Sequence, residues 1–130
     1  YRRSFSDLIL DNISVNKSVN LFDDVFFTPI YINELIEIIE NLLFKDLSGV
    51  FNVVGDERLT KYEFGLKIAK EIGVNHRLVK KTLLSERKDL VKRPFDLSLS
   101  NKKTKKSISI PIKSLSVQIK EMMAYNKQKI

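Results

Sequence analysis

The sequence predicts a small α/β fold, from the order of its elements and from one short apolar run. Helical and extended patterns alternate along the chain in the order helix, strand, helix, strand, helix. The run at residues 50–54 is almost continuously apolar and is followed by Gly55, which is typical of a strand buried on both faces of a parallel sheet. Because the other extended stretches are short, we expect most of its sheet to lie outside these 130 residues.

Two helices are predicted in the first half of the chain, with extended residues 19–22 and 25–32 between them. The first covers residues 4–16, where apolar side chains recur at helical spacing. The second is expected to be capped by Asn33 and is the clearest amphipathic helix of the chain. Its polar side, which includes Glu34, lies opposite a broad apolar stripe.

A third helix is predicted to begin after Thr60. Glu63 follows three residues later, which gives a capping box, and Gly73 is suited to end the helix. Beyond it, a short strand is expected within residues 77–84 and a last helix after Ser114.

Charge is distributed unevenly along the chain. Residues 1–65 contain 6 Lys and Arg against 11 Asp and Glu, whereas residues 66–130 contain 17 against 5. A basic half of this kind is compatible with anion binding, although lysines scattered on predicted helix faces more often only solvate the surface. The composition alone leaves both interpretations open.

Several function classes lack the residues that they require. The chain has no cysteine, and its single histidine, His76, excludes a multi-histidine metal site. Neither a Gly-x-Ser-x-Gly elbow nor a Gly-rich dinucleotide-binding loop is present. The apolar stretches are too short to predict a membrane span.

Arg93 is the residue whose local chemistry best favours a binding role. It precedes Pro94, which restricts the backbone of Arg93, and it lies in the basic half. A guanidinium held in this way is suited to bidentate contact with a phosphate group. The alternative is an ordinary surface arginine in a loop.

Four motifs follow one another along the chain. They are residues 27–35, 49–55 and 60–64, and Arg93-Pro94 followed by Leu99-Ser100 and by Lys102 or Lys103. In this order they resemble the C-terminal substrate-binding part of the extended short-chain dehydrogenases/reductases, in the NAD-dependent epimerase/dehydratase superfamily. Within that family they resemble the dTDP-4-dehydrorhamnose reductase group in particular, and the resemblance covers residues 1–123.

The resemblance implies the substrate-binding portion of a cytoplasmic, NAD(P)-dependent reductase of dTDP-rhamnose biosynthesis, with a nucleotide-diphosphate sugar as substrate. The Rossmann domain that binds NAD(P) and the catalytic Tyr-x-x-x-Lys would precede the region matched here. Residues 1–130 would then form a C-terminal fragment, a small α/β substrate lobe with late strands of the Rossmann sheet. Such a fragment would bind no cofactor and catalyse no reaction alone.

The resemblance also implies substrate-binding residues. Arg93 would face the substrate diphosphate, and Thr28 and Pro29 lie in the first motif. Arg3, with Tyr1 and Arg2, falls where a substrate loop would follow the catalytic core. Phe27 stands where many nucleotide-sugar epimerases have a phosphate-binding arginine, which favours the reductase branch over the epimerases. No residue is predicted to be catalytic, to bind the cofactor or to ligate a metal.

Two other functions remain open. The chain could belong to a non-catalytic member of the superfamily that serves as a binding or regulatory subunit, which the upstream sequence would reveal. A basic nucleic-acid-binding module is disfavoured because the lysine run at residues 102–106 contains no aromatic residue. The unpaired strand at residues 50–54 also predicts that the isolated chain self-associates, as a homo-oligomer or by exchanging strands.

Overall fold

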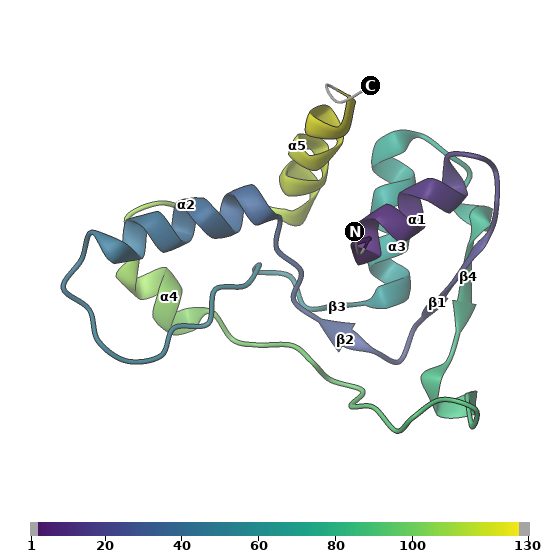
Figure 1. Ribbon diagram of the computed structural model, residues 1–130, viewed down its shortest axis with the longest axis horizontal. Helices are drawn as coiled ribbons and strands as arrows, with labels where there is room; N and C mark the ends of the chain where they lie inside the picture. Colours follow the sequence, from purple (N-terminus) through teal and green to yellow (C-terminus); the bar gives the residue numbers. More distant parts are fainter. Residues whose placement is uncertain (1–2, 128–130) are drawn as a thin grey trace. The chain divides into compact units, whose positions relative to one another are not determined.

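The computed structural model describes residues 3–127, which divide into two compact units (Figure 1). Unit 1 comprises the described residues within Tyr1–Phe27 and Leu59–Leu97. Unit 2 comprises those within Thr28–Arg58 and Ser98–Ile130. The chain therefore crosses three times from one unit to the other, and each unit is described by itself.

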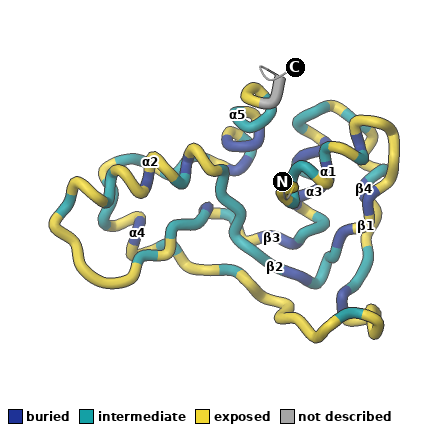
Figure 2. Tube along the Cα trace, in the orientation of Figure 1, coloured by how far each residue is buried: buried dark blue, intermediate teal, exposed yellow. Residues whose placement is uncertain are grey.

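Unit 1 is built from two helices and a parallel pair of strands. Helix α1 (Phe5–Ile13) packs against α3 (Lys61–Ile72), and α3 also packs on β1 (Val19–Phe22) and β4 (Val79–Thr82) (Figure 1). The two strands are parallel, with Val19 opposite Val79. The apolar core lies between these elements and is drawn dark blue in Figure 2. Its most deeply buried side chains are Ile9, Ile13, Leu21, Ile68 and Ala69.

Local hydrogen bonds determine where the helices of unit 1 begin. As predicted, Thr60 Oγ1 accepts a hydrogen bond from the Glu63 N–H, and the Glu63 carboxylate accepts one from the Thr60 N–H. Ser4 and Asp7 form the same box at the start of α1. Gly73, with φ of 71°, ends α3 in the left-handed conformation that favours glycine.

Gly65 allows α3 to approach the parallel strands closely. A Cβ atom at this position would lie 2.3 Å from Leu21 Cδ1 and 3.0 Å from Val79 Cγ1. Alanine could therefore be accommodated only if the helix or the strand side chains moved. The burial of Gly65 confirms its predicted place on the apolar face of this helix.

Unit 1 contains a second small sheet, in which β2 (Phe26–Phe27) has partners on both edges. One edge of β2 pairs antiparallel with β3 (Leu59–Thr60). At its other edge, a single parallel bridge joins Phe26 to Asp96. The Phe26 N–H donates to the Phe95 carbonyl at 2.7 Å, so the segment that follows Arg93-Pro94 lies beside β2.

Unit 2 contains the helices α2 (Ile32–Leu43), α4 (Lys102–Ser107) and α5 (Leu115–Lys127). Among the described residues, its buried apolar side chains are Ile38, Leu115 and Ile119. Polar side chains are buried beside them, namely Glu34, Thr104 and Gln118. Glu34, which the sequence places on the polar side of its helix, is therefore buried, whereas much of the apolar stripe is exposed.

Residues 50–54 are not paired as a strand among the described residues, because no second strand lies beside them there, so the predicted strand with its sheet elsewhere stays a prediction. The segment is nevertheless held in place, since carbonyl oxygens of three alternate residues accept hydrogen bonds from side chains in or just before α4. The donors and acceptors are Lys103 Nζ and Val50 O at 3.0 Å, Thr104 Oγ1 and Asn52 O at 2.7 Å, and Asn101 Nδ2 and Val54 O at 3.1 Å.

Three boundaries also differ from the predictions. The first helix ends at Ile13 rather than at residue 16, because the chain turns through Asn16, whose φ is 58°. The cap of α2 is Tyr31 rather than Asn33; the Tyr31 N–H donates to Gln118 Oε1, a contact distant in sequence. Within residues 25–32, only Phe26–Phe27 forms a strand, because β3 offers partners to these two residues alone.

Candidate functional site

Arg93 lies exposed in unit 1, two residues before the carbonyl that binds the Phe26 N–H. The backbone pairing of β2 with the segment after Pro94 therefore holds the Arg93 region beside this strand. No acidic partner of the Arg93 guanidinium is found among the described residues. The side chain is thus free to meet an anionic ligand, which is compatible with its predicted role.

Arg3 is placed differently. It is exposed just before α1, and its Nη1 atom forms an ion pair with the Asp11 carboxylate on that helix. A surface ion pair of this kind is screened by solvent and contributes little to stability. In the structure, the Arg3 side chain is therefore paired with a residue of α1. Its role in substrate binding stays a prediction. Tyr1 and Arg2 lie outside the described residues.

Thr28 and Pro29 belong to unit 2, where both make packing contacts. Thr28 Oγ1 accepts a hydrogen bond from the Leu99 N–H at 3.2 Å. The Pro29 carbonyl lies so close to Gly55 that a Cβ atom on Gly55 would be 2.2 Å from the Pro29 oxygen. These contacts join the first predicted motif to the second and the fourth. A direct role of Thr28 or Pro29 in binding stays a prediction.

A cluster of three aromatic rings and one lysine lies in unit 1, and the sequence did not point to it. Phe27 makes edge-to-face contacts with Phe5 and Phe64, at centroid distances of 6.2 and 5.4 Å. Lys61 Nζ lies 3.6 Å from the Phe27 ring centroid and 4.5 Å from that of Phe5. We call these four residues the Lys61 cluster. Burial of the ammonium group lowers the pKa of Lys61.

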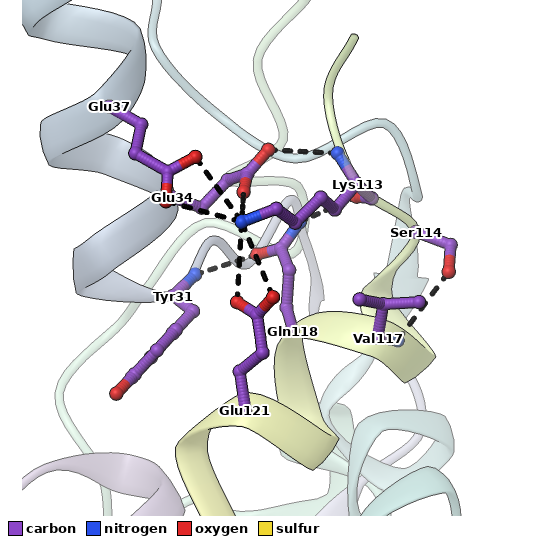
Figure 3. A network of polar contacts seen from close by, with 8 residues as sticks. All are labelled: Tyr31, Glu34, Glu37, Lys113, Ser114, Val117, Gln118 and Glu121. Atoms are coloured by element: carbon purple, nitrogen blue, oxygen red, sulfur yellow. Dashed lines mark hydrogen bonds and ion pairs between the residues drawn. The ribbon is translucent and has the colours of Figure 1, made fainter. Parts of the chain in front are cut away.

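A polar network in unit 2 centres on Lys113 (Figure 3). Its ammonium nitrogen lies 3.3 Å from Glu34 Oε2, 3.2 Å from Glu37 Oε2 and 3.3 Å from Glu121 Oε1. The Lys113 backbone N–H also donates to Glu34 Oε1 at 2.8 Å. Burial lowers the pKa of Lys113, but the hydrogen bonds to the three glutamates raise it by more. This lysine is therefore charged at neutral pH and unsuited to act as a base.

Gln118 extends the same network to the start of α2 (Figure 3). Its Oε1 accepts from the Tyr31 N–H at 2.8 Å, and its Nε2 donates to the Lys113 carbonyl at 2.7 Å. Both of these side-chain hydrogen bonds of Gln118 thus satisfy a backbone group in unit 2. Together with Lys113 it joins α2 to the start of α5, which is a structural role.

The described residues provide neither a metal-holding group of side chains nor a membrane-spanning helix. Over the part of the chain that the structure describes, no group of His, Cys, Asp and Glu side chains is arranged to hold a metal ion. No helix in that part is both long and apolar enough to cross a membrane. What the described residues offer to a ligand is cationic and aromatic, at Arg93 and at the Lys61 cluster.

Comparison with known proteins identifies a structural relative. The crystal structure of dTDP-4-dehydrorhamnose reductase from Bacillus anthracis strain Ames, in complex with NADP, superposes with a TM-score of 0.81 at 17% sequence identity. The alignment covers 96% of this chain and 44% of the reductase chain, so the chain spans less than half the length of that relative. The similarity confirms the predicted α/β fold of a Rossmann-type reductase. A search of curated proteins gives no match.

The family comparison agrees with the motifs found in the sequence. The model described as the RmlD substrate binding domain matches residues 1–127, which is nearly the whole chain. The match confirms the resemblance inferred from the four ordered motifs. The chain belongs to the RmlD substrate binding domain family.

Proposed function

We propose that this chain is the substrate-binding part of an NAD(P)-dependent reductase that acts on a dTDP-linked 4-dehydro sugar. The observation that carries the proposal is the family match over residues 1–127, since that family is defined by substrate binding. The relative of the same fold is a dTDP-4-dehydrorhamnose reductase that binds NADP. The ligand of this chain would be a nucleotide-diphosphate sugar, and the enzyme would be cytoplasmic.

The catalytic and cofactor-binding residues would lie in a separate Rossmann half, and the segment at residues 50–54 supports this. Side chains from and near α4 bind the carbonyls on one edge of the segment. On the other edge, the backbone groups of Phe51 and Val53 have no hydrogen-bond partner among the described residues. Unpaired groups on an extended edge favour addition to a sheet. The Rossmann half would supply the neighbouring strands.

Exposed apolar side chains on α2 support the same division. Along this helix, they recur at the spacing of a single helical face. Val50, at the start of the extended segment, is also exposed. Large apolar side chains exposed along one helical face mark a surface for contact with another protein part, which here would be the Rossmann half. The exposed side chains of α2 are Ile32, Ile36, Ile39 and Leu43. Self-association of the isolated chain through the strand edge at residues 50–54 stays a prediction.

Arg93 is the residue that we expect to bind the substrate diphosphate. It is exposed, it has no acidic partner among the described residues, and its backbone is restricted by Pro94. A guanidinium can bind two phosphate oxygens at once. In the full-length protein, Arg93→Ala is expected to raise the KM for the dTDP-linked substrate by roughly tenfold or more, the loss of one charged hydrogen-bonding group. The KM for the nicotinamide cofactor should change far less.

The measurement is steady-state oxidation of the reduced cofactor, with each substrate varied in turn. Lys92→Ala is the matched control, because it removes a neighbouring exposed positive charge without touching Arg93. An unchanged substrate KM in Arg93→Ala would remove this residue from the site. Absence of turnover in the wild-type protein, with dTDP-sugar binding retained, would instead favour a non-catalytic binding subunit.

A further inference from the structure

The Lys61 ammonium group occupies an unusual electrostatic position. Lys61 is the first residue of α3, where the positive end of the helix dipole disfavours a cation. Its side chain is half-buried, and burial lowers its pKa. The helix dipole and the burial of the side chain therefore both disfavour the positive charge of Lys61.

No carboxylate compensates this charge among the described residues. Glu63, the nearest acidic residue in sequence, is turned back to accept the Thr60 N–H at 2.7 Å. Asp23, which accepts from the Thr60 hydroxyl, forms its ion pair with Lys81 at 2.6 Å. Both neighbouring carboxylates are thus engaged by other groups, and Lys61 faces the aromatic rings alone.

The rings hold the ammonium group in position without satisfying it. Phe27 and Phe5 attract the cation by their negative faces. An ammonium group, however, carries three N–H donors, and ring faces are weak acceptors. Phe64 packs against both rings, stacked on Phe5 at 5.9 Å and edge-to-face with Phe27, so the position of the rings is itself fixed. The result is a positioned cation that has no protein oxygen as its acceptor among the described residues.

We propose that the Lys61 cluster binds a phosphate-class anion, with the Lys61 ammonium as its donor and the Phe27 ring fixing the position of that donor. Phosphate oxygens are strong acceptors for such a point charge. If the proposed function holds, the anion is the diphosphate of the nucleotide sugar. Only the identity of the ligand rests on the proposed function, because the geometry of the cluster does not depend on it.

The first experiment measures anion binding directly, with inorganic pyrophosphate as the probe. The full-length protein is acylated with a limiting amine reagent, with and without pyrophosphate, and modification of each lysine is followed by peptide mass spectrometry. We expect pyrophosphate to slow modification of Lys61 severalfold and to leave Lys70 unaffected. Lys70 is an exposed lysine on the same helix. Equal modification of Lys61 with and without pyrophosphate would overturn the proposal.

The second experiment separates anion binding from packing. Lys61→Met keeps an apolar stem over the rings and removes the charge, Lys61→Arg keeps the charge, and Lys70→Met is the control. We expect Lys61→Met to weaken dTDP binding by roughly tenfold or more, with little change in Tm, and Lys61→Arg to restore much of it. If Lys61→Met lowers the Tm but leaves dTDP affinity unchanged, the lysine is only a structural cover and the proposal fails.

The two experiments distinguish this inference from the proposed function. In one outcome, the wild-type protein turns over the dTDP-linked sugar and the Lys61→Met variant binds dTDP normally. This result would leave the reductase proposal intact and would exclude Lys61 from the binding site. In the opposite outcome, pyrophosphate protects Lys61 but the protein binds no dTDP-sugar. This result would support the Lys61 site and contradict the reductase proposal. In that case the cluster binds an anion, but the ligand is of another kind.

Discussion

The interior of unit 1 and the interior of unit 2 are stabilised by different kinds of interaction. Unit 1 buries a continuous set of apolar side chains between α1, α3 and the parallel strands, and Thr60 is its one buried polar residue among those described. In unit 2, Ile38, Leu115 and Ile119 are buried together with charged and amide side chains. Unit 1 thus has a core of the ordinary kind, whereas unit 2 depends on specific hydrogen bonds.

From this difference we infer that unit 2 on its own is less stable than unit 1. Its buried polar groups depend on Lys113, Gln118 and side chains near α4, and Glu34 Oε2 has only the ion pair with Lys113 and no hydrogen bond. Helix α2 meanwhile exposes apolar residues to solvent. A buried ion pair gives little net stability, because removing charges from water costs about as much as their attraction returns. Under the proposed function, the missing stability of unit 2 comes from the Rossmann half.

The largest expected effect distinguishes the apolar core from the exposed stripe. Ile68→Ala removes a fully buried side chain of α3 and should reduce the stability of unit 1 by about 2–5 kcal/mol. Leu43→Ala, on a side chain that is 76% exposed, should change the stability of the isolated chain by less than about 0.5 kcal/mol. Native-state hydrogen exchange would report each unit separately. A large loss from Leu43→Ala in the isolated chain would contradict this comparison.

An intermediate effect is expected in the polar network of unit 2. Lys113→Met leaves the Glu34 carboxylate, which is 1% exposed, without a counter-charge. We expect a loss of roughly 2–3 kcal/mol, below the value for fully buried pairs because Lys113 is partly exposed. Adding Glu34→Gln to Lys113→Met should recover part of the loss, as measured by urea unfolding. If the double variant is no more stable than the single one, the buried charge is not the cause.

The smallest expected effect is a pH dependence in unit 1. The Asp24 carboxylate accepts hydrogen bonds from the Leu84 and Ser85 N–H groups at 2.7 and 2.9 Å. Burial raises the pKa of Asp24, but these backbone hydrogen bonds bring it below its ordinary value of 3.8. Because the folded-state pKa is depressed, this stabilisation is present above pH 3.8 and is lost as the pH falls through the folded-state value.

Asp24→Asn tests this dependence. The variant should be less stable than wild type by less than about 1 kcal/mol at about pH 6, and the difference should disappear at about pH 2. Urea unfolding at the two values measures the effect. Glu86→Gln is a suitable control in the same unit, since the exposed Glu86 side chain forms no hydrogen bond or ion pair among the described residues. A difference that grows as the pH falls would contradict the assignment to Asp24.

The candidate site was only partly accessible to sequence reasoning. Arg93 could be singled out because Pro94 restricts its backbone and because the motifs around it resemble a family. Lys61 could not, since the chain contains 23 lysines and arginines and most solvate the surface. Its one local signal is a cation in the first turn of a well-capped helix, where an acidic residue is favoured. The unpaired state of that cation depends on Asp23 and Glu63, which are engaged by other groups.

The sequence by itself determined the α/β class, the capping box of Thr60 and Glu63, the glycine that ends α3 and the apolar face of that helix. These features depend on hydrogen bonds and side-chain spacing within a few residues, which the local sequence specifies. The tertiary structure alone decided the parallel pairing of β1 with β4, the burial of Glu34 against Lys113 and the approach of Lys61 to Phe27. Each of these joins residues at least 34 positions apart, and the energy of such contacts depends on which surfaces the fold brings together.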